Sequence, residues 1–485
     1  MTAADLLVVG GGPAGITAAA TAARAGLTVL LADERPSLGG QIFKQPGPGF
    51  TVTDPAAMDR QFRFGRSVID SLAGTGAEVL LRTSVVALEG KQVVLVTDGR
   101  PARTITVRRL VLAPGAHDRP VAFPGWTLPG VITAGGLQTL AKTQRVLPGN
   151  RMLFAGSGPV ALAFPAQLAK YGATIVAALE AGPAPGPGDF TRLAGAAWGN
   201  VDLLRDAAQY RATLLRHRVP LRYGRIVVRA EGDGRVERVV HARVDENWRV
   251  LAGTEEIADV DVLGLGYGFV PSLELMRLAG CEFDYHENLG GHIVRRDGWQ
   301  RTTVDGVYAA GDGAGVEGSY VAIDEGRIAG LAAAMDAGAI TARGAEALAK
   351  RARHRLSRRR ALTRATDRLY RFGRGIFELP TADTVICRCE NVREHAIAAA
   401  IETSADINVV KACTRAGMGP CQGRNCQRQI AAMISARHGR PIADVALATP
   451  RMPVRPVPIS ALADHSIAGP TLFLAAGTDP EGTKP

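Results

Sequence analysis

The sequence predicts an α/β protein with two βαβ units and a small helical domain near its C-terminal end. Three observations predict this class: a strand pattern ending on a glycine-rich turn at residues 5–15, the same order of elements at residues 151–179, and the closely spaced cysteines Cys387, Cys389, Cys421 and Cys426. At 485 residues the chain is too long for one core, because single cores stop growing at roughly 250–300 residues. We therefore expect about three domains.

The first βαβ unit covers residues 5–32. Residues 5–10 form a short apolar run that is typical of a buried parallel strand. Residues 14–25 are alanine-rich and predict a helix, and residues 27–32 predict a second strand.

A G-x-G-x-x-G turn, made by Gly10, Gly12 and Gly15, joins this strand to this helix. The first glycine permits the tight turn, the second lets the backbone approach a pyrophosphate, and the third lets the helix pack on the strand. The helix N-terminus favours phosphate, and Asp33, which ends the next strand, is placed to bind a ribose hydroxyl. The turn alone is weak evidence, but its context predicts a dinucleotide site.

The same order returns in the second unit, where Gly156, Gly158 and Ala161 form G-x-G-x-x-A and Glu180 ends the following strand. The acid disfavours a 2′-phosphate, so NADPH is not expected. The continuation Ala-Gly-Pro-Ala-Pro-Gly-Pro-Gly is unusual for a reductase domain. Three interpretations remain open for this unit: an NADH site, a site for another nucleotide, and a purely structural domain.

Three further motifs resemble those of the two-dinucleotide-binding-domain flavoproteins, also called glutathione-reductase-like flavoproteins. The motifs are Gly39-Gly40-Gln41, Leu112-Ala113-Pro114-Gly115-Ala116 and Val307-Tyr308-Ala309-Ala310-Gly311-Asp312. The resemblance implies two nested Rossmann-like domains with FAD in the first and NAD(P)H in the second. It implies that the FAD-binding residues are Gly10, Gly12, Pro13, Ala14, Gly15, Asp33, Glu34, Gly40, Gln41, Val85, Ala113, Gly115, Gly311 and Asp312, and that the second-nucleotide residues are Gly156, Gly158 and Glu180.

Four cysteines form the pattern Cys387-Arg388-Cys389, thirty-one residues, and Cys421-Gln422-Gly423-Arg424-Asn425-Cys426. The number of thiolates allows either a tetrahedral zinc or an iron–sulfur cluster. The glycine-rich stretch 416–420 can direct backbone N–H groups at sulfides, which favours iron and sulfur. Disulfide reductases of the flavoprotein family need a redox cysteine pair, yet residues 41–49 have no cysteine and the second unit lacks C-x-x-C. Electrons must therefore leave the flavin by another route, which this segment provides.

The same segment closely resembles the bacterioferritin-associated-ferredoxin-like [2Fe–2S] domain and differs from the plant-type ferredoxin spacing. The resemblance implies that Cys387, Cys389, Cys421 and Cys426 are the four cluster ligands. Cys413 is expected to be a semi-buried thiol and Cys281 a core residue.

The arrangement as a whole resembles the FAD/[2Fe–2S] α-type subunits of bacterial multi-subunit amine dehydrogenases. This group includes opine oxidases, D-hydroxyproline and L-proline dehydrogenases and hydrogen cyanide synthase. The resemblance implies an FAD-dependent oxidoreductase acting on CH–NH or CH–NH₂ donors as an electron-transferring subunit. A sarcosine-oxidase-like FAD subunit would oxidise the amine, with a small ferredoxin-like subunit and an FMN at a subunit junction as further parts of the complex.

Two alternatives to this function remain. One is a self-contained NADH-dependent FAD oxidoreductase that passes electrons to its own [2Fe–2S] centre. The other is an assembly scaffold in which the second nucleotide site is purely structural.

The net charge of +11 raises the question of nucleic acid or an anionic membrane as a partner. The basic residues are scattered, are not interleaved with aromatic residues and accompany no DNA-reading motif, so nucleic acid is not expected. We find no signal-peptide pattern and no apolar run near the ~18 residues of a membrane span. Six cysteines in a chain of this length, four of them at metal-ligand spacing, favour a reducing compartment over a disulfide framework. We therefore expect a cytoplasmic protein, at most peripheral to the inner face of the membrane.

Two segments outside the βαβ units have biased compositions. The basic stretch 346–360 is expected to be a solvated linker helix. The proline-rich tail after residue 449 is expected to be extended and to wrap another surface or hang free. The expected divisions are the FAD-binding domain at 1–120 and 266–345, the second dinucleotide-binding domain at 121–265, a linker at 346–380, the [2Fe–2S] domain at 381–445 and the tail at 446–485.

Overall fold

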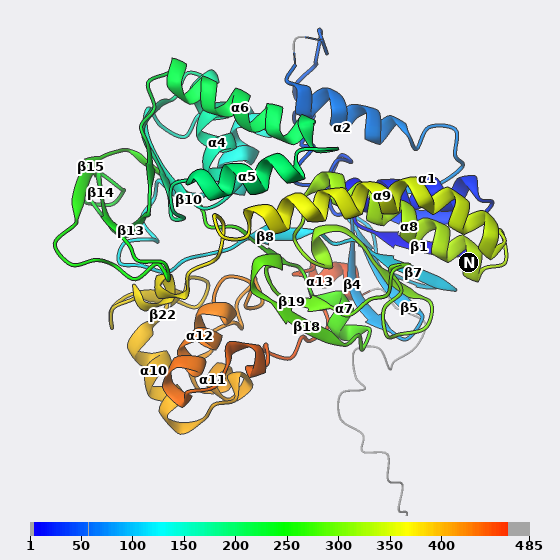
Figure 1. Ribbon diagram of the computed structural model, residues 1–485. Helices are drawn as coiled ribbons and strands as arrows, with labels where there is room; N and C mark the ends of the chain where they lie inside the picture. Colours follow the sequence, from blue (N-terminus) through cyan, green and yellow to red (C-terminus); the bar gives the residue numbers. More distant parts are fainter. Residues whose placement is uncertain (1–3, 57, 464–485) are drawn as a thin grey trace, which may run out of the picture.

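The structure, a computed structural model, describes residues 4–56 and 58–463 (Figure 1). Its first unit is built on a five-stranded parallel sheet with the order β20-β7-β1-β2-β3. The central strand β1 pairs with β2 on one side and with β7 on the other. The strands are β1 (Leu6–Val9), β2 (Val29–Ala32), β3 (Glu78–Leu80), β7 (Arg109–Leu112) and β20 (Val307–Ala309).

Two helices, α1 (Pro13–Arg24) and α8 (Ser319–Asp336), pack against each other beside this sheet. Glycine makes the contact possible, because a Cβ atom on Gly326 would lie 2.1 Å from Ala14 O. The alanine-rich sequence of α1 is buried along most of its length. The strand, helix and strand predicted for residues 5–32 are confirmed.

The second unit has its own five-stranded parallel sheet, with the order β12-β11-β10-β16-β9. The chain enters this unit through β8 (Ala116–Asp118) and leaves it through β17 (Phe269–Pro271), which pair antiparallel. The first sheet is completed by β20 only afterwards, so the second unit is inserted into the first, as the nested arrangement predicts. The strands are β9 (Val131–Thr133), β10 (Arg151–Gly156), β11 (Thr174–Glu180), β12 (Leu221–Tyr223) and β16 (Val262–Gly266), and the helices are α3 (Ala134–Gln138), η1 (Thr139–Gln144), α4 (Pro159–Lys170), α5 (Pro187–Ala196) and α6 (Val201–Arg216).

Two three-stranded antiparallel sheets flank the two parallel ones. The Asp-Gly pairs at 98–99 and 233–234 lie in the connections between paired antiparallel strands. The strands are β4 (Thr83–Glu89), β5 (Gln92–Thr97) and β6 (Arg103–Thr106) in one sheet and β13 (Arg225–Glu231), β14 (Arg238–Arg243) and β15 (Glu256–Asp259) in the other. The remaining elements of the body are α2 (Arg60–Asp70), α7 (Glu274–Leu278), β18 (Phe283–His286), η2 (Glu287–Leu289), β19 (Gly291–Val294) and η3 (Gly311–Gly313).

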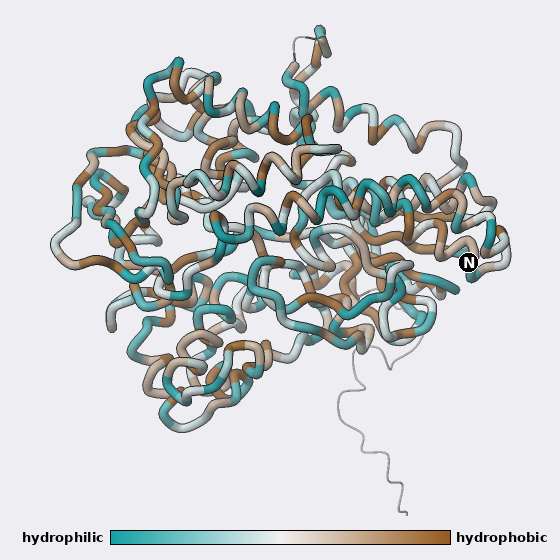
Figure 2. Tube along the Cα trace, viewed as in Figure 1, coloured by the Kyte–Doolittle hydropathy of each residue, from teal (hydrophilic) through white to brown (hydrophobic). Residues whose placement is uncertain are grey.

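The basic stretch 346–360 is helical, but the solvated-linker interpretation is wrong. It lies within α9 (Ala342–Thr366), which crosses the molecule and packs against α8 and α5 (Figure 1). Much of this helix is hydrophilic (Figure 2), yet Ala349, Ala352 and Leu356 are buried. Its arginines pair with carboxylates of other elements: Arg355 with Asp324, Arg359 with Asp202, and Arg360 with Glu317 and Glu325. These partners lie far away in the sequence, so the charge run alone does not reveal them.

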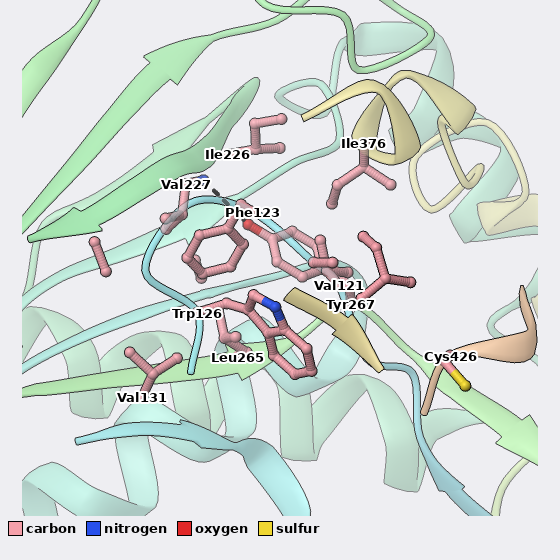
Figure 3. Close-up of a cluster of buried hydrophobic side chains, with 14 of the residues drawn as sticks. Val121, Phe123, Trp126, Val131, Ile226, Val227, Leu265, Tyr267, Ile376 and Cys426 are labelled. Carbon is pink, nitrogen blue, oxygen red and sulfur yellow. Dashed lines mark hydrogen bonds between the residues drawn. The ribbon is translucent and has the colours of Figure 1, made fainter. Parts of the chain in front are cut away.

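The four-cysteine segment forms a lobe of its own, at the lower left of Figure 1. One hydrophobic cluster crosses from the second unit into this lobe and joins Phe123 and Trp126 to Ile386 and Cys426 (Figure 3). Trp126 Nε1 donates a hydrogen bond to Val385 O at 2.6 Å. The lobe is therefore packed on the body. Its elements are β21 (Val385–Cys387), β22 (Val392–Arg393), α10 (Glu394–Thr403), α11 (Ile407–Thr414), α12 (Gln427–His438) and η5 (Ile442–Asp444), and η4 (Arg374–Glu378) precedes them.

The described part of the proline-rich tail lies on the sheet of β4, β5 and β6. Val454 N donates to Val86 O at 2.8 Å, and Ala102 N donates at 2.8 Å to Ala461 O in α13 (Ile459–Ala463). Residues 464–485, the rest of the expected tail, lie outside the described residues. Within the described ranges, no helix is both long and apolar enough to cross a membrane.

Candidate functional site

The glycine turn of the first unit lies at the switch point of the first sheet. From β1 the chain goes through α1 to β2 on one side, while β7 lies on the other side. Ligands of such sheets bind in the crevice at the carboxyl ends of the strands at this point. Gly10 follows β1 and Ala113 follows β7, and Ala113 N donates to Val9 O at 2.9 Å. Two of the predicted motifs therefore line one crevice.

Each glycine of the turn has a separate geometric requirement. Gly10 has φ of 104°, and a Cβ atom there would lie 2.2 Å from Ala113 O. A Cβ atom on Gly15 would lie 1.7 Å from Gly10 O, so the helix can approach the strand only with glycine here. At Gly12 the only atom of the described residues within 4 Å of an added Cβ, chain neighbours aside, is Gly40 Cα at 3.8 Å. The backbone at Gly12 is thus open to a ligand, as the motif requires.

Asp33 closes this turn. Its Oδ2 atom accepts a hydrogen bond from Gly11 N at 2.5 Å, and its Oδ1 atom accepts one from Arg35 N at 2.7 Å. Burial raises the pKa of Asp33, although the two backbone donors oppose this effect. The neighbouring Glu34 points elsewhere and pairs with Arg455 at 3.3 Å.

The late motif meets the same crevice. A Cβ atom on Gly311 would lie 2.7 Å from Ala14 Cβ, and one on Gly313 would lie 3.1 Å from Gly115 N. Asp312 Oδ1 accepts hydrogen bonds from the backbone of residues 317 and 318, at 3.1 and 2.8 Å. Burial raises the pKa of this carboxyl as well.

Most of the residues predicted for the first site therefore converge, and a few do not. Those that the contacts bring together are Gly10, Gly12, Pro13, Ala14, Gly15, Asp33, Gly40, Ala113, Gly115, Gly311 and Asp312. Gln41 is exposed, and Val85 packs into the hydrophobic core with Leu88 and Leu95.

Sequence reasoning missed a buried carboxylate behind the late motif. Glu325 has no exposed side-chain area and accepts a hydrogen bond from Gly311 N at 2.9 Å. Arg296 reaches the same carboxylate at 2.7 and 2.8 Å, and Arg360 reaches it at 2.6 Å. The only sequence signal for it is the charged group Asp324, Glu325 and Arg327 in the middle of the alanine-rich α8.

A second missed residue is Lys44, which is buried shortly after the Gly39-Gly40-Gln41 motif. Its Nζ atom donates to Gly135 O at 2.8 Å and to Thr139 Oγ1 at 2.6 Å. Burial lowers the pKa of Lys44 to about 7, and the nearby Asp118 only partly opposes this effect. A lysine beside the buried Phe43 is the signal that could have found it.

The candidate residues of the second unit lie on the other sheet. Gly156 meets Gly266 across the switch point, where an added Cβ would lie 2.3 Å from Gly266 O. Glu180 accepts hydrogen bonds from Gly158 N at 2.9 Å and from Gly182 N at 2.8 Å. Burial raises the pKa of Glu180 to about 7.

Four of the five cysteines of the C-terminal lobe lie in two pairs. Cys387 and Cys426 are in hydrogen-bonding contact, and so are Cys389 and Cys421. The hydrogen bond from Cys426 lowers the pKa of Cys387 to about 5 and raises the pKa of Cys426. Gly417 N donates to Cys387 Sγ at 3.4 Å, so the glycine-rich stretch directs an N–H group at sulfur.

In the described part of the chain, no three His, Cys, Asp or Glu side chains are arranged as they would be around a metal ion. The expectation for Cys281 holds because it is buried, whereas Cys413 is exposed and not semi-buried. Cys413 lies on the short helix α11, whose buried positions are Ile407 and Val410.

Two sequence families match the chain. Residues 4–338 match the family described as pyridine nucleotide-disulphide oxidoreductase, and residues 382–465 match the sarcosine oxidase A3 domain.

Several curated proteins are similar over nearly the whole chain. The chain is 35% identical to the HcnB subunit of hydrogen cyanide synthase from Pseudomonas aeruginosa, over 94% of this chain and 97% of that protein. It is 34% identical to an opine oxidase subunit of Rhizobium meliloti (strain 1021), over 95% of this chain and 98% of that protein. The alpha subunit of sarcosine oxidase from Corynebacterium sp. (strain P-1) is 31% identical over 36% of this chain and 19% of that protein.

Solved structures share the fold. L-proline dehydrogenase from P. horikoshii has a TM-score of 0.67 at 22% identity and covers 96% of this chain and 80% of its own. Thioredoxin reductase of T. acidophilum has a TM-score of 0.51 at 19% identity, over 70% of this chain and 99% of its own. The chain therefore shares its α/β architecture with these two proteins.

Proposed function

Because the chain belongs to the pyridine nucleotide-disulphide oxidoreductase family, we propose that it is the electron-transferring subunit of a multi-subunit dehydrogenase whose partner subunit oxidises an amino acid or secondary amine. The chain is an oxidoreductase by family, and its relatives include subunits of opine and sarcosine oxidases. The observation that carries the proposal is that one chain combines an open dinucleotide crevice with a separate lobe of paired cysteines.

The first crevice fits FAD. Its glycines leave the backbone open at Gly12, and the N-terminus of α1 presents unpaired N–H groups to a pyrophosphate. Asp33 and Asp312 approach from opposite sides of the crevice, at the end of β2 and after β20. The buried Glu325 and its two arginines fix the loop that carries Asp312. These residues bind and orient the cofactor.

The cysteine lobe fits a [2Fe–2S] cluster better than zinc. In such a cluster four thiolates serve two irons, so each iron takes two, and the structure has two sulfur pairs. A structural zinc needs four ligands around one ion, and the choice of a cluster over zinc rests on the glycine-rich stretch beside the thiols and on the resemblance of the segment. The Gly417 N–H group that points at Cys387 Sγ would tune the cluster's potential. When bound, FAD supplies two-electron chemistry and the cluster supplies one-electron transfer.

The cysteine inventory supports electron transfer over disulfide reduction. The sequence has six cysteines: four form the two pairs of the lobe, Cys413 is exposed on α11 of the same lobe, and Cys281 is buried. No redox pair follows Gly40, where the disulfide-reducing flavoproteins carry theirs. The resemblance to the relatives named above is the basis for proposing an amine substrate, a sarcosine-oxidase-like partner and an FMN at a subunit junction.

The test is the cofactor content of the full chain, purified natively with any co-purifying subunits. We expect a flavin spectrum, an EPR signal after reduction, and about two irons and two acid-labile sulfides per chain. Cys387→Ser and Cys426→Ser should lose the iron and the EPR signal but keep the flavin. Cys413→Ser is the matched control in the same lobe and should keep both. A chain that contains zinc and no flavin would overturn the proposal.

A further inference from the structure

In the second unit, the glycine turn and the end of β11 form the place where a nucleotide would bind, which we call the cradle. The segment that follows α9 covers this cradle. The ring of Tyr370 lies over Gly158, where a Cβ atom would be 3.9 Å from Tyr370 Cγ. Gly158 is the glycine at which a G-x-G-x-x-A turn opens its backbone to a pyrophosphate. In the first unit the corresponding residue is Gly12, and no described atom from outside that unit lies within 4 Å of an added Cβ there.

The backbone of the same segment closes the end of β11. A Cβ atom on Gly182 would lie only 2.1 Å from Leu369 O, so this approach requires glycine. Leu369 itself is 4% exposed. The unusual glycine- and proline-rich continuation after Glu180 is therefore shaped to receive residues 369–370.

The two units differ in whether another segment of the chain covers the acid at the end of the second strand, and not in whether backbone groups bind that acid. Glu180 accepts hydrogen bonds from Gly158 N and Gly182 N. Asp33 of the first unit accepts hydrogen bonds from Arg35 N, which corresponds to Gly182 N, and from Gly11 N, one position earlier in the turn than the counterpart of Gly158. Each acid is thus held by two backbone N–H groups. Of the two, Glu180 is the one that lies beneath Leu369 and Tyr370, and its charge contributes, after burial, to the raised pKa of Tyr370.

Ion pairs on both sides hold the covering segment in place. Arg368 Nε donates to Asp189 Oδ1 at 3.0 Å, and the Asp189 side chain also accepts from Gly186 N at 2.9 Å at the start of α5. Earlier on α9, Arg359 pairs with Asp202 of α6 at 2.7 Å. The helices α5 and α6 of the second unit therefore both anchor the C-terminal part of α9.

The chain beyond Tyr370 follows the second unit to the cysteine lobe. Phe372 packs edge-on against Trp248 at 5.0 Å, and Gly375 N donates to Asn247 O at 2.8 Å. Gln429 of α12 then donates to Phe377 O at 2.9 Å. The linker is thus fixed at the cradle at one end and at the lobe at the other.

We propose that the second dinucleotide unit binds no pyridine dinucleotide, because Leu369 and Tyr370 occupy its cradle. The unit instead holds in place the linker that leads to the cysteine lobe. The segment takes the space in front of Gly158 and Gly182 that a pyrophosphate and ribose would need. This inference concerns the second sheet alone and holds whether or not the first crevice takes FAD.

The direct test is equilibrium dialysis of NADH and of NADPH against the FAD-saturated full chain. We expect no saturable binding up to about 1 mM, the upper end of common KM values. Saturable binding that is lost in Gly158→Val would overturn the proposal. Binding that survives Gly158→Val lies outside the cradle and leaves the proposal in place.

A second measurement asks whether the segment is a fixed plug or a lid that NADH displaces. Trypsin can cut after Arg368 and Arg371, and we expect slow cleavage that NADH does not change. Tyr370→Gly should speed this cleavage by about tenfold or more, because local opening becomes easier without the ring. Tyr370→Phe, which keeps the ring, is the matched control and should match the wild type. Faster cleavage on adding NADH, or no effect of Tyr370→Gly, would overturn the proposal.

Discussion

Arg360 of the basic helix donates a hydrogen bond at 2.6 Å to Glu325, whose side chain is fully buried behind the late glycine-aspartate motif. Arg296 holds the other side of the same carboxylate, and Gly311 N donates to it. A buried charge of this kind is tolerated only with such partners. The helix that looks like a charged linker therefore reaches the loop that carries Asp312.

Arg360→Ala should destabilise the protein and weaken flavin retention. Removing one partner of a buried ion pair typically costs about 3–5 kcal/mol. We expect about 2 kcal/mol here, because Arg296 remains and Arg360 is partly exposed. Chemical unfolding and the flavin content of the purified protein measure the two effects. Arg351→Ala, at an exposed position of the same helix, should change stability by less than about 0.5 kcal/mol. Equal effects of both variants would contradict this role of Arg360.

Gly15→Ala should abolish FAD binding at the first crevice. The added Cβ would lie 1.7 Å from Gly10 O, so α1 must move away from β1 and the turn must open. Flavin content and far-UV circular dichroism separate loss of cofactor from loss of fold. Gly195→Ala in α5 is the control, since no described atom lies within 4 Å of its added Cβ and alanine favours the helix. A Gly15→Ala variant with full flavin content would show that the crevice is not the cofactor site.

Lys44 should make stability depend on pH in alkaline solution. Its pKa is about 7 in the folded protein and 10.5 in the reference state, so the unfolded chain binds more protons between these values. The contribution of this group to the free energy of unfolding therefore rises as pH increases from 7 to 10.5, by up to about 1.4 kcal/mol per pH unit. Below pH 7 the lysine is charged in both states, so the full cost of burying the charge opposes folding.

Urea unfolding of the wild type and of Lys44→Met between pH 7 and 10 measures this effect. The difference between the two free energies of unfolding should shift in favour of the wild type as the pH rises. Lys350→Met, at an exposed position of α9, should give a curve parallel to the wild type. A Lys44→Met curve that is also parallel would rule out Lys44 as the titrating group.

Local patterns predict the elements and turns well. The strand, glycine turn and helix at residues 5–25 and their repeat at 151–179 are written in consecutive residues, and both are confirmed. The motifs at Ala113 and Asp312 are expected from resemblance, and the contacts bring them to the same crevice because strands β1, β7 and β20 are neighbours.

The features that sequence reasoning missed depend on residues far apart in the chain. Tyr370 covers Gly158 across more than two hundred residues, and Arg360 meets Glu325 only after α8 and α9 pack together. The charge pattern of α9 predicts a solvated helix, and this prediction fails for the arginines that pair with carboxylates of other elements. A sequence shows which residues are charged, but it does not show where their partners lie. The expectation for Cys413 fails for the related reason that burial follows from packing and not from residue type.

Trp126→Phe should loosen the cysteine lobe without disturbing the flavin crevice. The indole Nε1 donates at 2.6 Å to Val385 O, two residues before Cys387, and the ring packs in the cluster shared by the second unit and the lobe (Figure 3). Phenylalanine keeps most of the apolar contact but removes this hydrogen bond, which costs about 0.5–1.5 kcal/mol. Hydrogen exchange of the β21–β22 hairpin and iron retention should both show this loss, while flavin content stays constant. Trp198→Phe, at a side chain that is 78% exposed, is the control and should behave as the wild type. If the two variants exchange equally fast at β21, the bond from Trp126 does not hold the lobe on the body.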